Sequence, residues 1–118
     1  MLREQYQAAI RIFPSELSPI NNLIMLELEE ENFSAAKALV DDAMSKNDKN
    51  ARLWQLRARL LRAQNDMAGA QAAMEYAVEL APDDPLILRN LADIYIATKN
   101  YEAAAEFVGK ILVQTPDE

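Results

Sequence analysis

The sequence predicts an all-α protein built from pairs of antiparallel helices, and two observations support that prediction. Self-comparison of the 118 residues finds a repeat every 34 residues, in which turn, alanine and proline positions agree. The segments between the turns have the apolar spacing of helices, and none shows the period-two alternation of a β-strand. The length leaves room for one domain with one continuous core.

Four sets of residues recur at the 34-residue interval: turn residues, the bulky residues after them, alanines and prolines. They are Asn32, Asp66 and Asn100; Phe33, Met67 and Tyr101; Ala36, Ala70 and Ala104; and Pro14, Pro82 and Pro116, with Asp48 in the remaining proline position. The recurrence divides the chain into a truncated unit, 1–16, and three repeats. The repeats are 17–50, 51–84 and 85–118.

Seven helices are expected, a lone one over 1–12 and then two in each repeat. The pairs are 19–30 with 34–46, 51–63 with 67–80, and 85–97 with 101–114. Asp84 can cap a helix that begins with Pro85, a placement that suits the fixed φ and missing N–H of proline. Ser18 before Pro19 repeats this signal, so Ser18 is expected to be a cap. Prolines 82 and 116 are expected to end the second helices of their repeats.

These residues resemble the tetratricopeptide repeat (TPR) family, whose pattern is W-x2-L-G-x2-Y, then A-x3-F, then P. The second repeat carries Trp54, Ala58, Leu61, Ala70, Met74, Ala77 and Pro82. The third repeat carries Leu88, Leu91, Ala92, Tyr95, Ala104, Val108, Ile111 and Pro116. The first repeat and the truncated unit carry Ile20, Leu23, Ala36, Val40 and Ala43, and Tyr6, Ala9 and Pro14. The resemblance covers the whole chain and implies an α-solenoid, a right-handed superhelix in which the first helix of each pair (the A helix) lines a concave groove.

No capping helix is expected after 101–114, whereas repeat arrays normally end with one. Val108, Ile111 and Leu112 are therefore expected to be partly exposed, and self-association through uncapped ends is predicted. The chain is expected to be a fragment of a longer bacterial scaffold protein, from the periplasm or the cytoplasm.

Composition argues against most catalytic chemistry. The chain has no histidine, no cysteine and only two glycines, which excludes disulfides, imidazole or thiolate metal sites, Ser–His and Cys–His catalysis and a glycine-rich phosphate loop. With twelve Lys plus Arg against nineteen Asp plus Glu, the net charge is −7, so nucleic acid is not expected as a partner. No run of residues is long and apolar enough to span a bilayer. We expect neither an enzyme nor a cofactor.

A polar stripe along the 51–63 helix is the candidate binding surface. At about 100° per residue, Arg52, Gln55, Arg59 and Arg62 share one stripe, opposite an apolar arc. The family resemblance makes this stripe face the groove, and the neighbouring A helices contribute equivalent positions. The expected groove residues are Asn21, Met25, Arg52, Gln55, Arg59, Arg62, Arg89 and Asp93. The planar fork of arginine suits carboxylates, so an acidic peptide or protein segment is the expected ligand. The alternative is that these arginines only solvate a helix face.

Two charged residues depart from the family pattern. Glu27 takes the place of a buried tyrosine, and Arg57 lies where a buried leucine is expected, so we expect the two to pair across adjacent A helices. The alternative is that each reaches solvent separately.

Glu27 and Glu31 lie one turn apart, but no second carboxylate cluster supports a metal site. Asn21, Met25, Leu56, Leu86 and Asn90 do not match the carboxylate-binding positions of chaperone-binding TPR modules.

The sequence therefore predicts a non-catalytic protein–protein interaction scaffold with an arginine-containing groove, part of a larger assembly. The alternative is a structural spacer, as in periplasmic scaffolds of bacterial exopolysaccharide export or pilus assembly, with partners bound by other repeats.

Overall fold

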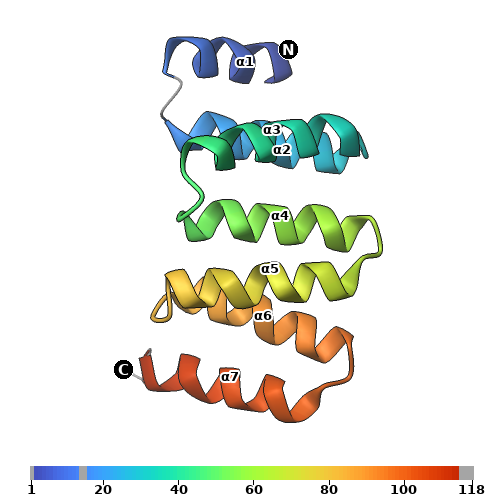
Figure 1. Ribbon diagram of the computed structural model, residues 1–118, viewed down its shortest axis with the longest axis vertical. Helices are drawn as coiled ribbons and strands as arrows, with labels where there is room; N and C mark the ends of the chain where they lie inside the picture. Colours follow the sequence, from blue (N-terminus) through green and yellow to red (C-terminus); the bar gives the residue numbers. More distant parts are fainter. Residues whose placement is uncertain (1, 14–15, 115–118) are drawn as a thin grey trace. The chain divides into compact units, whose positions relative to one another are not determined.

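The computed structural model describes residues 2–13 and 16–114, in which seven helices are joined by short turns and no strand occurs (Figure 1). The all-α prediction is confirmed. The chain forms two compact units, Met1–Asp48 and Lys49–Glu118. The one continuous core for which the length leaves room stays a prediction, and each unit has a core of its own.

The first unit contains α1 (Leu2–Ile12), α2 (Leu17–Glu29) and α3 (Phe33–Lys46). Helix α2 packs against both α3 and α1. The buried apolar side chains of the first unit come from α2 and α3, because no residue of α1 is buried. They are Ile20, Leu23, Ile24, Ala36, Val40, Ala43 and Met44.

The second unit contains α4 (Ala51–Ala63), α5 (Met67–Leu80), α6 (Pro85–Ala97) and α7 (Tyr101–Gln114). Helix α5 packs against α4 and α6, and α6 also contacts α7 and α4. The core joins small side chains of α5 to large aliphatic ones of α6. Alanines at such a contact allow two helices to approach closely, which explains their recurrence. The contributing residues are Ala70, Ala73 and Ala77 on one side and Ile87, Leu91 and Ile94 on the other.

The turn inside each repeat has the same geometry at all three 34-residue positions. The second turn residue has a positive φ, 60° at Glu31, 67° at Asn65 and 65° at Lys99. The N–H of the third turn residue then bonds the carbonyl five residues earlier, at 2.8, 2.8 and 2.7 Å. This six-to-one bond, with a five-to-two bond beside it, is the Schellman motif that satisfies the last carbonyls of a helix. The predicted turns are therefore confirmed as one repeated structure.

The helix starts agree with the prediction in the second and third repeats and differ in the first. The side chain of Asp84 accepts a hydrogen bond from the N–H of Leu86, and Asn50 caps α4 in the same way. The expected cap at Ser18 is wrong, because α2 begins at Leu17 with Glu16 before it and places Pro19 in its first turn. Proline is tolerated at any position in the first turn of a helix, because the backbone N–H groups of that turn have no partner inside the helix. The expectations for Pro14 and Pro116 lie outside the described residues.

Candidate functional site

Seven residues at the predicted stripe positions of α4 and α6 are exposed. Arg52, Arg59 and Arg62 are exposed on α4. The residues 34 positions after the stripe positions are Leu86, Arg89, Asp93 and Ile96, all exposed on α6. Because α4 and α6 contact each other and these positions are equivalent in the 34-residue repeat, we group the exposed side chains as one candidate surface, here named the α4–α6 face. Its members are Arg52, Arg59, Arg62, Leu86, Arg89, Asp93 and Ile96.

Gln55 differs from its neighbours in the stripe because it is only 6% exposed. Its Oε1 accepts a hydrogen bond of 3.2 Å from Nη1 of Arg52, so this buried side chain helps to position the exposed guanidinium of Arg52. A second restraint on Arg52 is Asp84, whose carboxylate lies 4.0 Å from Nη2. Gln55 thus supports the α4–α6 face and is not part of its exposed surface.

Two arginines of the face are available to a ligand. Within residues 2–13 and 16–114, the side chains of Arg62 and Arg89 make no hydrogen bond or ion pair with the rest of the chain. Asp93 is exposed and without a partner in the same sense. The face therefore presents several cations beside one anion, on a protein whose net charge is −7.

The two predicted groove residues of the first repeat lie in the other unit. Asn21 and Met25 are half-buried on α2. The structure places them on the first helix of their pair, as expected, and their contact with a partner stays a prediction.

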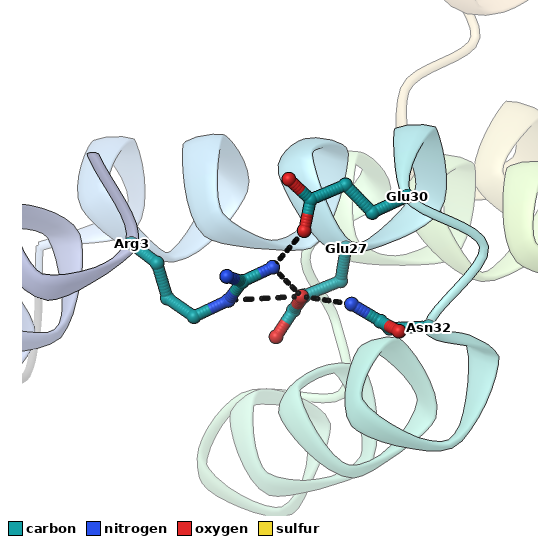
Figure 2. Close-up of polar contacts among 4 residues, drawn as sticks. All are labelled: Arg3, Glu27, Glu30 and Asn32. Carbon is teal, nitrogen blue, oxygen red and sulfur yellow. Dashed lines mark hydrogen bonds and ion pairs between the residues drawn. The ribbon is translucent and has the colours of Figure 1, made fainter. Parts of the chain in front are cut away.

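A buried acid forms a second polar site, in the first unit (Figure 2). Glu27 is 5% exposed, and its Oε1 accepts hydrogen bonds from Nε and Nη2 of Arg3, at 3.2 and 2.8 Å. Asn32 donates a third bond of 3.1 Å from Nδ2, and Arg3 also pairs with Glu30. The guanidinium of Arg3 holds the pKa of Glu27 below its usual value, against the opposing effect of burial. The same contacts raise the pKa of Arg3.

Within the first unit, the arginine that bonds the buried carboxylate of Glu27 is Arg3 of α1. Arg57 belongs to the second unit, so its expected pairing with Glu27 stays a prediction. The guanidinium of Arg57 lies 5.7 Å from the centre of the Trp54 ring, a cation–π distance. Sequence reasoning missed Arg3 because its separation of 24 residues from Glu27 matches neither a helical turn nor the 34-residue repeat.

The described residues contain neither a metal-binding cluster nor a membrane-spanning helix. Among the described residues, no group of three or more carboxylates could hold a metal ion, and Glu31 of the acidic run is exposed. None of the helices in the described ranges is long and apolar enough to cross a membrane.

Helix α7 carries the exposed apolar side chains that the sequence predicted. Val108 and Leu112 are exposed and Ile111 is half-buried. At the positions 34 residues earlier, Met74 and Ala77 are buried in the core of the second unit. The expected exposure is confirmed, while self-association through this helix stays a prediction.

Comparison with known families gives two matches, which together span most of the chain. Two family models, each described as tetratricopeptide repeat, match residues 21–85 and 61–118. A search of curated proteins returned no match.

Several solved structures share the fold at low sequence identity. MamA 41-end from Desulfovibrio magneticus RS-1 superimposes with a TM-score of 0.77 at 16% identity, over 98% of this chain and 67% of that one. The MamA RS-1 ArsTM double mutant gives 0.77 at 15%, over 96% and 64%. A further crystal structure of MamA gives 0.74 at 13%, over 97% and 67%. The chain thus spans about two thirds of the length of these proteins, and the likeness shows a helical solenoid.

Proposed function

We propose that this chain, which belongs to the tetratricopeptide repeat family, binds an acidic segment of a protein partner on its α4–α6 face. The repeats are a scaffold for protein–protein interaction, and we infer that the chain is non-catalytic. The finer proposal is supported by the exposure of Arg52, Arg59, Arg62 and Arg89 on two helices that contact each other, in a protein whose net charge is −7.

The electrostatics of the face favour a ligand with carboxylates. Arginine offers parallel N–H donors that bind a carboxylate in a bidentate manner. Arg62 and Arg89 are exposed and need not break an existing contact to do so. Exposed ion pairs contribute only about 0.2–1 kcal/mol each, so several must form together. The expected complex is therefore weak and sensitive to salt, since exposed pairs are screened over roughly 8–10 Å at ordinary ionic strength.

The proposal includes the remaining predicted positions. Repeats 17–50, 51–84 and 85–118 each supply one A helix, and Asn21 and Met25 of the first are proposed to contact a protein partner as well. Their half-buried side chains carry no charge, so their contribution is hydrogen bonding and van der Waals contact.

A peptide titration tests the proposal directly. The probe is a fluorescein-labelled glutamate-rich peptide, with a glutamine-rich peptide of equal length as the uncharged probe. The wild-type chain is expected to bind only the acidic peptide, and binding should weaken as salt is added. The double variant Arg62→Glu/Arg89→Glu should lower its affinity at least about tenfold, which is a change of about 1.4 kcal/mol.

The matched control is Lys99→Glu/Lys110→Glu, which changes the net charge equally at exposed positions outside the face. Position 99 has a positive φ, but Glu31 occupies the equivalent turn position, so glutamate is compatible with this backbone. The control variant should bind as the wild type does. If both double variants lost affinity alike, binding would follow net charge and the face would have no special role. If no acidic peptide bound at all, the spacer alternative would be favoured.

A further inference from the structure

We propose that the partner segment is amphipathic, with two aliphatic side chains that flank its acidic ones and contact Leu86 and Ile96. This inference rests on the proposed function and adds a sequence pattern for the ligand. It comes from a difference between the two helices of the α4–α6 face.

The two helices present different chemistry at equivalent positions. Where α4 carries Arg52 and Arg62, α6 carries Leu86 and Ile96, each 34 residues later. Leu86 is 39% exposed and Ile96 is 49% exposed, whereas Ile87, Leu91 and Ile94 of the same helix are buried. Single exposed aliphatics are common on protein surfaces. Here two of them lie on one stripe with Arg89 and Asp93 between them, so each is bounded by a charged side chain.

The spacing of the aliphatic pair favours an extended ligand. Ten residues of helix separate Leu86 from Ile96, which is roughly 15 Å at about 1.5 Å per residue. An extended chain covers this distance in about four residues, at roughly 3.3 Å per residue. Side chains of an extended chain alternate between opposite sides, so residues separated by four lie on the same side.

A segment lying along the boundary between α4 and α6 can therefore satisfy both helices at once. Its first, third and fifth side chains would face α6, with aliphatic residues against Leu86 and Ile96 and a polar residue opposite Arg89 and Asp93. Its second and fourth side chains would face the arginines of α4. The resulting pattern is aliphatic, acidic, polar, acidic, aliphatic.

Three short peptides test this pattern on the intact chain. Their central segments are Leu-Glu-Ser-Glu-Leu, Ser-Glu-Ser-Glu-Ser and Glu-Leu-Ser-Leu-Glu, each between identical Gly-Ser flanks. The first and third have the same composition, so they differ only in which side chains share a side. We expect the first peptide to bind at least about tenfold more tightly than the other two in an NMR titration of the chain.

Protein variants then locate the contact. Leu86→Ser/Ile96→Ser should reduce affinity for the first peptide to that for Ser-Glu-Ser-Glu-Ser and leave the latter unchanged. Both positions are exposed, and a thermal melt of the variant would show whether its fold is retained. Ile12→Ser, at an exposed position in the other unit, is the matched control and should change nothing.

The outcomes separate this inference from the proposed function. Equal binding of the first two peptides, with sensitivity to Arg62→Glu/Arg89→Glu, would overturn the aliphatic pattern and retain the acidic ligand. Unchanged binding of the first peptide to Leu86→Ser/Ile96→Ser would overturn the pattern as well. If neither these peptides nor the glutamate-rich peptide bound, both proposals would fail.

Discussion

At the scale of the residue, one position of the A helix receives a different side chain in each repeat. Tyr95 in the third repeat aligns with Leu61 in the second and Glu27 in the first. The hydroxyl of Tyr95 donates a 2.9 Å hydrogen bond to Glu75 of α5, and burial together with that carboxylate raises its pKa to about 12. Glu27 is bonded to Arg3 of α1. In both cases the helix that precedes the A helix supplies the polar partner that a buried polar group requires.

Glu27 should make the stability of the first unit depend on pH. Its folded-state pKa lies below the ordinary 4.5, so the carboxylate stabilises the fold above that pH and the contribution is lost as the pH falls through the folded pKa. Glu27→Gln should lower the free energy of unfolding at pH 7 by about 1–2 kcal/mol, because it removes a charge-assisted bond to a partly exposed arginine. It should also reduce the loss of stability below pH 4.5.

Urea unfolding at several pH values measures both effects. Glu29→Gln, an exposed substitution on the same helix, is the control and should leave the free energy and its pH dependence near those of the wild type. An acid-induced loss of stability as steep in Glu27→Gln as in the wild type would show that other carboxylates carry the pH dependence.

At the scale of the element, the second helices of the repeats begin with caps of different quality. The side chain of Asp66 accepts a 2.9 Å bond from the N–H of Gly69, three residues later. In the third repeat the corresponding bond from Ala103 to Asn100 is 3.4 Å, and in the first Asn32 makes no cap bond. A Cβ built on Gly69 would lie 2.5 Å from Oδ2 of Asp66. The glycine therefore allows the close cap that alanine hinders.

The two glycines of the chain should respond differently to alanine. Gly109→Ala should stabilise the protein by about 0.5–1 kcal/mol, because nothing lies within 4 Å of the added Cβ and alanine is the better helix former. Gly69→Ala should gain less or destabilise, since weakening a helix cap costs about 1 kcal/mol and offsets the propensity term. Thermal melts of both single variants and of the double variant would measure the two stability changes and show whether they add. An equal gain from both would show that the Asp66 cap does not depend on the missing side chain.

The helices were predictable from sequence to within two residues, because proline, turn and alanine positions agree at a fixed interval. The conformation of the turns could not be predicted from the sequence. Their αL position, where glycine is the usual residue, holds Glu31, Asn65 and Lys99. The backbone conformation of the turn therefore repeats although the residue type does not. The start of α2 was missed because a Ser-Pro pair fits a helix cap and also fits the first turn of a helix.

The candidate site was predictable in part. The helical period placed Arg52, Arg59 and Arg62 on one exposed stripe, as the structure has them. The same period put Gln55 on that stripe, but a side chain between two arginines can fold under them, and Gln55 is buried. The pairing of Arg3 with Glu27 depends on how α1 packs on α2, which no local pattern encodes.

At the scale of the whole molecule, the two units differ in how firmly their helices are held. Among the helices that the structure describes, α1 has no buried residue and contacts α2 alone, and its ion pair with Glu27 is partly open to solvent. Helix α6 has six buried residues and contacts three other helices of its unit. Amide hydrogens exchange by local opening, whose free energy ranges from near zero to that of global unfolding. The amides of α1 should therefore exchange fastest among the helices, and those of α5 and α6 slowest.

Hydrogen exchange of the intact chain, resolved by mass spectrometry, can test this order together with its cause. Arg3→Ala removes the hydrogen bonds from α1 to the buried carboxylate, so it should speed exchange throughout α1 and at the end of α2 near Glu27. Exchange in α6 should stay as it is in the wild type, because repeat arrays pass stability mainly between neighbouring pairs. Arg11→Ala, an exposed change on α1 itself, should leave both rates unaltered. Protection of α1 equal to that of α6 would mean that α1 is held by more than its contacts with α2, and the role given to Glu27 would then be wrong.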